Sequence, residues 1–210
     1  KHGYSSRIQF RVLMRGLFKF IVKPKGKLYN NTKKVNDTSL ILNNNISEHK
    51  YVNRNAIVVQ TPKGFETPIN VGDEIIIHHN VFRRWYDQQG KERSSSSYFK
   101  DNLYFVQIDQ IYLYKVDNKW EALPGFTFVK PIEEDNDFYF FQKENSSVGI
   151  VKYSDGSFDI DELIGFHPNV NHEFVIDGEL LYKIPNKFIE IKYEYKGNEK
   201  AYNPSWSQSS

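Results

Sequence analysis

Four histidines are the side chains of this sequence best suited to metal binding. They stand in two similar stretches, HHNVF and HPNVNHEF, as His78, His79, His167 and His172. Imidazole nitrogens are common zinc ligands. The sequence lacks a third ligand at a recognised spacing such as H-E-x-x-H, and it contains no cysteine that could complete a thiolate site. We therefore interpret the histidines as polar turn residues and expect no metal and no cofactor.

Basic and aromatic side chains form a second group, in the stretch RRWYDQQGKERSSSSYF that begins with Arg83, Arg84, Trp85 and Tyr86. Such side chains can stack on and neutralise single-stranded nucleic acid, but Trp, Tyr and Arg are also the usual anchors of protein interfaces. The 28 basic and 26 acidic residues leave a formal net charge of only +2, which gives no global field to attract nucleic acid. A protein contact is the more economical interpretation, with nucleic acid as the alternative.

Catalytic signatures are missing from the sequence. It contains no P-loop, no G-x-S-x-G and no G-x-G-x-x-G pattern. The acidic cluster EEDND at 133–137 is typical of a solvated loop and not of a paired general acid and base. We therefore expect a protein that is not an enzyme.

Short hydrophobic segments dominate the chain and predict an all-β fold with little helix. Aromatic residues make up 16% of the sequence, and its mean hydropathy is −0.62, so we expect a folded protein that is not embedded in a membrane. No apolar stretch approaches the roughly 20 residues that span a bilayer. Runs such as FKFIVKP, NAIVVQTP, LYFVQIDQIYLYK and KFIEIKYEY are rich in β-branched and aromatic residues and are bounded by Gly, Pro, Asn or Asp. Many short strands of this kind close into barrels or sandwiches.

Four blocks of the sequence recur in the same order, which indicates a tandem duplication. FIVKP at 20–24 recurs as TFVKP at 127–131, and NAIVVQTPKG at 55–64 recurs as VGIVKYSDG at 148–156. The later blocks are NVGDEIIIHHNVF and FDIDELIGFHPNV, followed by DNLYFVQIDQIYLYK and DGELLYKIPNKFIEIK. Pro124 and Gly125 punctuate the boundary between the copies. The first copy is longer only at 28–53 and at 83–100.

This order of blocks resembles the GroES-like co-chaperonin family, also called chaperonin-10, in both halves of the chain. FIVKP, SLIL, RNAIVVQ, INVGDEIIIHH and YFVQIDQIYLYK stand in the order of the family pattern. Gly72 in the Val-Gly-Asp turn can adopt the positive φ that a tight turn demands. The second copy has Ile160-Asp161-Glu162 at this turn and departs from the pattern there.

The resemblance implies two tandem small GroES-like β-barrels with long loops. The expected division is 1–16 as an N-terminal arm, 17–119 and 120–195 as barrels, and 196–210 as a polar C-terminal tail that frays. The first barrel would carry a mobile loop at 28–50 and an extended roof hairpin at 78–100, with Arg83, Arg84, Trp85 and Tyr86 as roof or interface residues.

In the family, an aliphatic tripeptide on the mobile loop inserts into an apolar groove of the chaperonin. Leu40, Ile41 and Leu42, which we call the aliphatic triplet, stand at that place in a run of Asn, Asp, Thr and Lys. The resemblance thus implies a lid subunit that binds a group I chaperonin ring and assists protein folding. The alternative for these residues is a short buried strand beneath a loop.

A homo-oligomer without a membrane partner is expected from the same resemblance. The absence of cysteine suits a reducing cytoplasm. The composition is rich in Asn, Lys and Ile, and some bacteriophages carry divergent co-chaperonins, so the protein could act in a host cytoplasm or belong to a virion. The second hypothesis is therefore a non-catalytic structural protein, for instance a bacteriophage virion component, built on the same barrel.

Overall fold

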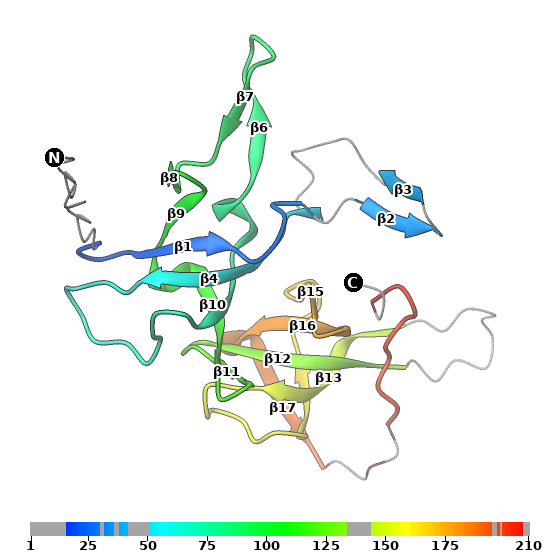
Figure 1. Cartoon of the computed structure of the whole chain (residues 1–210). Coiled ribbons are helices and arrows are strands. Elements are labelled where there is room, and N and C mark those ends of the chain that lie inside the picture. Colours follow the sequence, from blue (N-terminus) through cyan, green and yellow to red (C-terminus); the bar gives the residue numbers. More distant parts are fainter. Residues whose placement is uncertain are drawn as a thin grey trace, which may run out of the picture. The chain divides into compact units, whose positions relative to one another are not determined.

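The computed structural model of the chain is nearly all β (Figure 1). It describes residues 16–29, 32–35, 38–41, 51–133, 144–194, 197 and 199–207. The named helical elements in these ranges are three-residue 3₁₀ turns: η2 (His79–Val81), η3 (Ile108–Gln110) and η4 (Asn186–Phe188). No helix among the described residues is long and apolar enough to cross a membrane. The predicted all-β class is confirmed.

Two compact units divide the chain between Gln110 and Ile111. The sequence placed the boundary at 119/120, after the segment that becomes β10. The strands before the boundary are β1 (Phe20–Pro24), β2 (Thr32–Val35), β3 (Thr38–Ile41), β4 (Asn55–Gln60), β5 (Glu74–Ile77), β6 (Arg84–Tyr86), β7 (Glu92–Ser94), β8 (Tyr98–Lys100) and β9 (Leu103–Val106). Those after it are β10 (Ile111–Val116), β11 (Lys119–Ala122), β12 (Phe126–Glu133), β13 (Glu144–Tyr153), β14 (Leu163–Phe166), β15 (His172–Ile176), β16 (Glu179–Pro185) and β17 (Ile189–Tyr193).

The two units repeat one strand order. In unit 1 the antiparallel strands follow the order β8-β9-β1-β4-β5, and in unit 2 they follow the order β15-β16-β12-β13-β14-β17. The register repeats too, because a valine of the central strand pairs with a valine on one side and a tyrosine on the other: Val22 with Val58 and Tyr104, and Val129 with Val151 and Tyr182. The sequence repeats therefore correspond to a structural repeat. The strand orders of the described residues form no closed ring, so closure into two barrels stays a prediction.

The turn before β5 and β14 is also repeated, although its residues differ. In unit 1 the N–H of Gly72 donates to the carbonyl of Val58 at 2.8 Å, and in unit 2 the N–H of Asp161 donates to that of Val151 at 2.8 Å. Gly72 has a φ of 98° and Asp161 a φ of 67°. Aspartate tolerates this left-handed conformation better than most residues with a side chain. The missing glycine therefore leaves the turn intact.

Equivalent positions fill the two cores. Five pairs of buried residues occupy the same places in the two registers: Val22 and Val129, Val58 and Val151, Ile75 and Ile164, Ile77 and Phe166, and Val106 and Ile184. In unit 2 they belong to a cluster that also holds Leu180 and Tyr182. Alternate residues of a strand face the same side of its sheet, so equivalent positions of the two registers face equivalent sides.

The C-terminal tail was expected to fray, and this prediction is wrong for residues 199–207, which are attached to unit 2. Backbone hydrogen bonds of 2.9 and 2.8 Å join Glu133 to Lys200 and Tyr202 to Pro131. The Asn203 side-chain oxygen accepts from the N–H of Leu180 at 3.0 Å. Tyr202 also packs on the core cluster of unit 2. A polar composition suggested fraying, but one tyrosine and one asparagine suffice to attach the segment.

Candidate functional site

Two residues of the aliphatic triplet, Leu40 and Ile41, lie in strand β3, and Leu42 lies outside the described residues. β3 pairs antiparallel with β2, so that Leu40 stands opposite Lys33 and Ile41 opposite Thr32. The two strands form a separate two-stranded sheet. The predicted loop therefore carries a short hairpin between β1 and β4 that is not a member of the main sheet of unit 1.

The two ends of this loop are held together where they enter unit 1. We call Tyr29, Val52 and Asn53 the loop stem; all three are buried, and Tyr29 and Val52 form an isolated β-bridge. The side-chain amide of Asn53 donates to the carbonyls of Lys25 and Lys27 at 2.8 and 2.7 Å. Asn53 is 2% exposed, and a buried amide without hydrogen-bond partners is costly, so these two bonds stabilise its position. The stem thus fixes both points from which the loop departs.

The loop stem is also attached to the second long insertion of unit 1. The Tyr29 hydroxyl accepts a hydrogen bond from the N–H of Arg84 at 2.7 Å. The Arg84 guanidinium carbon lies 5.0 Å from the centre of the Tyr29 ring, within the range of a cation–π contact. No local pattern marks this contact, because the two residues are 55 positions apart. The triplet-bearing loop and the predicted roof hairpin therefore share one base.

The segment predicted to form the roof contains a two-stranded hairpin of β6 and β7 (Figure 1), and its role as a roof stays a prediction. Arg84 forms an ion pair with Glu92 at 2.6 Å, and Arg93 forms one with Asp87 at 2.8 Å. The N–H of Lys91 and the guanidinium of Arg93 donate hydrogen bonds to the Asp87 carboxylate and hold its pKa below the ordinary value. Arg84 and Arg93 thus already have carboxylate partners within the hairpin, which weakens the nucleic-acid interpretation.

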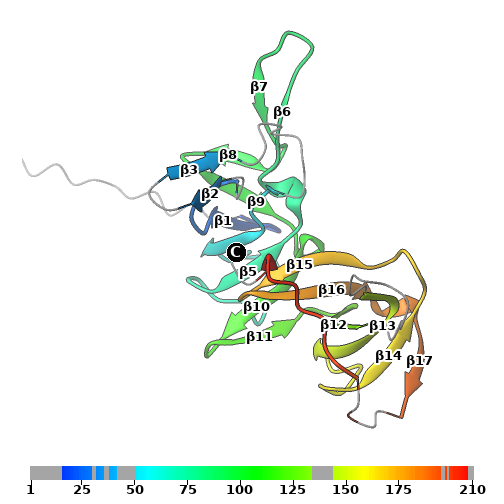
Figure 2. The same ribbon diagram turned by 90° about the vertical axis from the view of Figure 1, so that its right-hand side faces the viewer.

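The first strand of the hairpin carries two exposed aromatic rings beside exposed polar and charged residues. Trp85 is 47% and Tyr86 56% exposed, whereas Arg83, which precedes β6, is half-buried. In both ribbon views the hairpin projects away from β8 and β9 of its own unit (Figures 1 and 2). Exposed Trp and Tyr on a projecting hairpin are typical of a protein contact.

Three of the four histidines, His78, His79 and His167, lie at turns as predicted, whereas His172 lies in a strand. His78 begins the turn η2, and its Nδ1 accepts from the N–H of Asn80 at 3.1 Å. The rings of His78 and His79 stack with centres 4.3 Å apart. His167 Nδ1 lies 2.9 Å from the carbonyl oxygen of Pro168, and His172 opens β15. Within the described ranges, no three His, Asp or Glu side chains are grouped as metal ligands.

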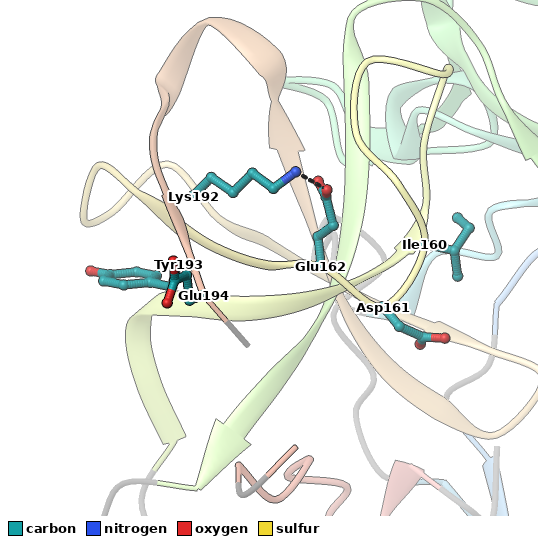
Figure 3. A pocket seen from close by; sticks show the side chains of 6 residues that line it. All are labelled: Ile160, Asp161, Glu162, Lys192, Tyr193 and Glu194. Atoms are coloured by element: carbon teal, nitrogen blue, oxygen red, sulfur yellow. Dashed lines mark hydrogen bonds and ion pairs between the residues drawn. The ribbon is translucent and has the colours of Figure 1, made fainter. Parts of the chain in front are cut away.

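A shallow depression lies in unit 2 beside β17 and was not predicted (Figure 3). Its volume is about 460 Å³, and its lining residues are Ile160, Asp161, Glu162, Lys192, Tyr193 and Glu194. Lys192 and Glu162 point toward each other and form an ion pair. The hydrogen bond from Lys192 lowers the pKa of Glu162, and the same bond raises the pKa of Lys192. An ion pair in an open depression is suited to a surface contact.

Comparison with protein families, curated proteins and solved structures finds no match to this chain. Its function therefore has to be argued from the loop, the hairpin and the repeated frame.

Proposed function

We propose that the protein is a co-chaperonin-like lid subunit whose aliphatic triplet binds a group I chaperonin and thereby assists protein folding. The observation that carries the proposal is the separate β2–β3 hairpin, which contains Leu40 and Ile41 and departs from a buried stem. This arrangement suits a binding loop, because the stem fixes its origin while the loop adds no strand to the main sheet. The order of sequence blocks supports the same function through its resemblance to co-chaperonins.

The energetics favour a weak individual contact repeated around a ring. Burying three aliphatic side chains yields about 1.5–3 kcal/mol each. Fixing a loop residue costs about 1–2 kcal/mol of backbone entropy, so much of the gain is lost when the loop is ordered. Several loops on one oligomer raise the effective concentration and add avidity without new contacts. A homo-oligomeric lid can therefore bind firmly and still be released when the chaperonin changes shape.

Co-sedimentation with a group I chaperonin, with and without ATP, tests this function. We compare the natural chain with a variant in which Leu40, Ile41 and Leu42 are all replaced by Ser. We expect the natural chain to sediment with the chaperonin in the presence of nucleotide and the variant to remain in the supernatant, because serine cannot fill an apolar groove.

A matched control keeps the same loop and changes polar residues only. Replacing Asn43, Asn44 and Asn45 by Ser should leave chaperonin binding intact. Equal binding of the natural chain and the triplet variant would show that the triplet is not the contact. The lid function itself would be overturned if the natural chain did not bind at all.

A structural role, such as that of a virion component, is the second candidate and is favoured by the exposed aromatic rings of the β6–β7 hairpin. Trp85 and Tyr86 are the side chains that such a role would use. The double variant Trp85→Ser and Tyr86→Ser should then abolish assembly with the structural partner. The lid function predicts instead that this variant still sediments with the chaperonin.

A further inference from the structure

Strand β17 is an open edge of the six-stranded sheet in unit 2. It is the last strand in the sheet order, and it pairs only with β14 within the described part of the chain. Its residues from Glu190 to Tyr193 are exposed, including Ile191 at 50% and Tyr193 at 40%. An exposed edge with apolar side chains is a template for pairing with another strand. Something of matching chemistry is therefore expected to cover it.

The repeat shows how the same edge is covered elsewhere. β10 and β17 occupy corresponding places, because each follows a 3₁₀ turn whose last carbonyl accepts from a histidine N–H: Gln110 from His78 at 2.8 Å, and Phe188 from His167 at 3.0 Å. β10 pairs antiparallel with β11 and has four buried residues. β17 has no such following strand in the described residues. The described residues thus leave this place in the frame of unit 2 unfilled.

The sequence of β17, Ile-Glu-Ile-Lys-Tyr, is complementary to itself in an antiparallel pair. When two copies are aligned on Ile191, Glu190 of each stands opposite Lys192 of the other. The same register places Ile189 opposite Tyr193. Opposite charges and aliphatic–aromatic pairs directly across from each other stabilise antiparallel strands. We propose that β17 pairs with β17 of a second copy of this chain, about a two-fold axis through Ile191.

Contacts within unit 2 hold the edge in a shape suited to this pairing. A side chain on Gly165 would come within 3.0 Å of the Tyr193 ring and 3.4 Å of Ile191, so the glycine leaves room for both. Lys192 is tied to Glu162 (Figure 3). Its ammonium group has three donors and can accept a second carboxylate. Lys192 can thus keep Glu162 while it meets Glu190 of the second copy.

The two-fold contact does not depend on the lid function. It uses unit 2 and no chaperonin, whereas the aliphatic triplet belongs to unit 1. Self-association and chaperonin binding can therefore be measured separately, and the failure of either one is distinguishable from failure of the other. Pairing of β17 with itself also differs from pairing with another strand. Only two copies of β17 related by a two-fold axis place Glu190 opposite Lys192 twice.

Charge reversal in two separate variants tests the register directly. Glu190→Lys alone places Lys opposite Lys192, and Lys192→Glu alone places Glu opposite Glu190, so each variant meets like charges twice. We expect each to weaken dimerisation of the full chain about tenfold in sedimentation velocity. An equimolar mixture restores two Lys–Glu pairs across the axis and should dimerise more tightly than either variant alone, although the Lys192→Glu chain lacks the ion pair with Glu162. Lys63→Glu, an exposed charge reversal in unit 1, should leave dimerisation unchanged.

Cross-linking locates the axis, because the natural chain contains no cysteine. Ile191→Cys places one thiol on each side of the axis, within the Cα separation of about 4.4–6.8 Å that a disulfide needs. We expect mild oxidation to produce a covalent dimer. Ile160→Cys, exposed in the adjacent turn, is the control and should not cross-link at the same rate. A chain that stays monomeric at all concentrations, or a mixture of charge variants that fails to recover, would overturn the proposal.

Discussion

Unit 1 and unit 2 share the same order and register of strands, which we call the frame, but they differ in the hairpins that are added to it. Gly72 and Asp161 make the same turn hydrogen bond, and Ile75 and Ile164 occupy the same buried position. Between the first two strands of the frame, unit 1 carries the β2–β3 hairpin and its stem. Unit 1 also carries the β6–β7 hairpin, which has no counterpart among the named strands of unit 2.

The additions lie outside the shared frame, which indicates where this fold tolerates change. Backbone pairing and a few buried side chains fix the frame, so the loops that leave it are free to diverge. The candidate binding residues of unit 1 lie in those additions, while unit 2 leaves the β17 edge open. The comparison therefore predicts large effects for changes in the shared frame and smaller ones for changes at positions where the units differ.

The largest expected effect comes from the shared core. Ile75→Ala and Ile164→Ala each remove a fully buried side chain at the same place in the two frames. Each should lower the free energy of unfolding of its own unit by about 2–5 kcal/mol. Hydrogen exchange of the two units under mild urea measures this. A much smaller loss for one of them would break the equivalence of the cores.

A smaller loss of stability is expected for a substitution in the loop stem of unit 1. Asn53→Ala removes the two hydrogen bonds by which the side-chain amide joins the carbonyls of Lys25 and Lys27. This should cost about 1–3 kcal/mol of stability, measurable by urea denaturation. Asn55→Ala is a useful control, because the Asn55 side chain makes only a 3.4 Å contact with Asn53. Equal costs for the two variants would argue against a specific role for Asn53.

Substitutions of Gly72 test whether its turn is equivalent to the Asp161 turn of unit 2. Gly72→Val forces a β-branched residue into a positive φ and should cost about 1–2 kcal/mol. Gly72→Asp should cost less, because Asp161 already adopts this conformation in unit 2. Thermal unfolding of the two variants checks the order. A reversed order would show that the two turns are not equivalent.

The smallest expected effect is the loss of stability of unit 2 at low pH. Burial would raise the pKa of Asp155, but hydrogen bonds donated by Ser157, the N–H of Gly125 and Asn186 outweigh it and hold this pKa below its ordinary value. The folded unit therefore binds this proton less readily than the unfolded chain. The resulting stability is present above about pH 4 and is lost as the pH falls below it.

The corresponding stretch of unit 1, TPKG, contains no carboxylate. The Asp155 turn of unit 2 should therefore lose protection against hydrogen exchange earlier than the corresponding turn of unit 1 as the pH falls below 4, after correction for the intrinsic exchange rate. In Asp155→Asn this acid dependence of unit 2 should be reduced. An unchanged acid dependence in that variant would assign the effect to another group.

Local patterns in the sequence predicted the frame, and long-range contacts limited the prediction of the site. FIVKP and TFVKP alternate and recur, so the strands and the repeat could be recognised from neighbouring residues. The contact between Tyr29 and Arg84 joins positions far apart in the chain, and nothing local marks either residue. Asn53 is one of many asparagines in a polar run. Only the structure shows that its side chain binds two backbone carbonyls. The tail was mistaken for a fraying segment for the same reason.

The open edge of β17 could not be predicted either. IEIKY has the strand pattern of IYLYKV. Only the sheet order reveals that β10 is followed by β11, whereas no strand follows β17 within the described ranges. The aliphatic triplet was identified by its contrast with polar neighbours and by its place in the order of blocks. Its assignment to chaperonin binding stays a proposal.

Hydrogen exchange of residues 38–42 in the full chain tests that assignment most directly. On addition of a group I chaperonin with ATP, we predict that these backbone amides become protected, while those of β13 in unit 2 exchange as before. Unchanged exchange at 38–42, under conditions in which the chaperonin protects an established co-chaperonin, would contradict the lid function.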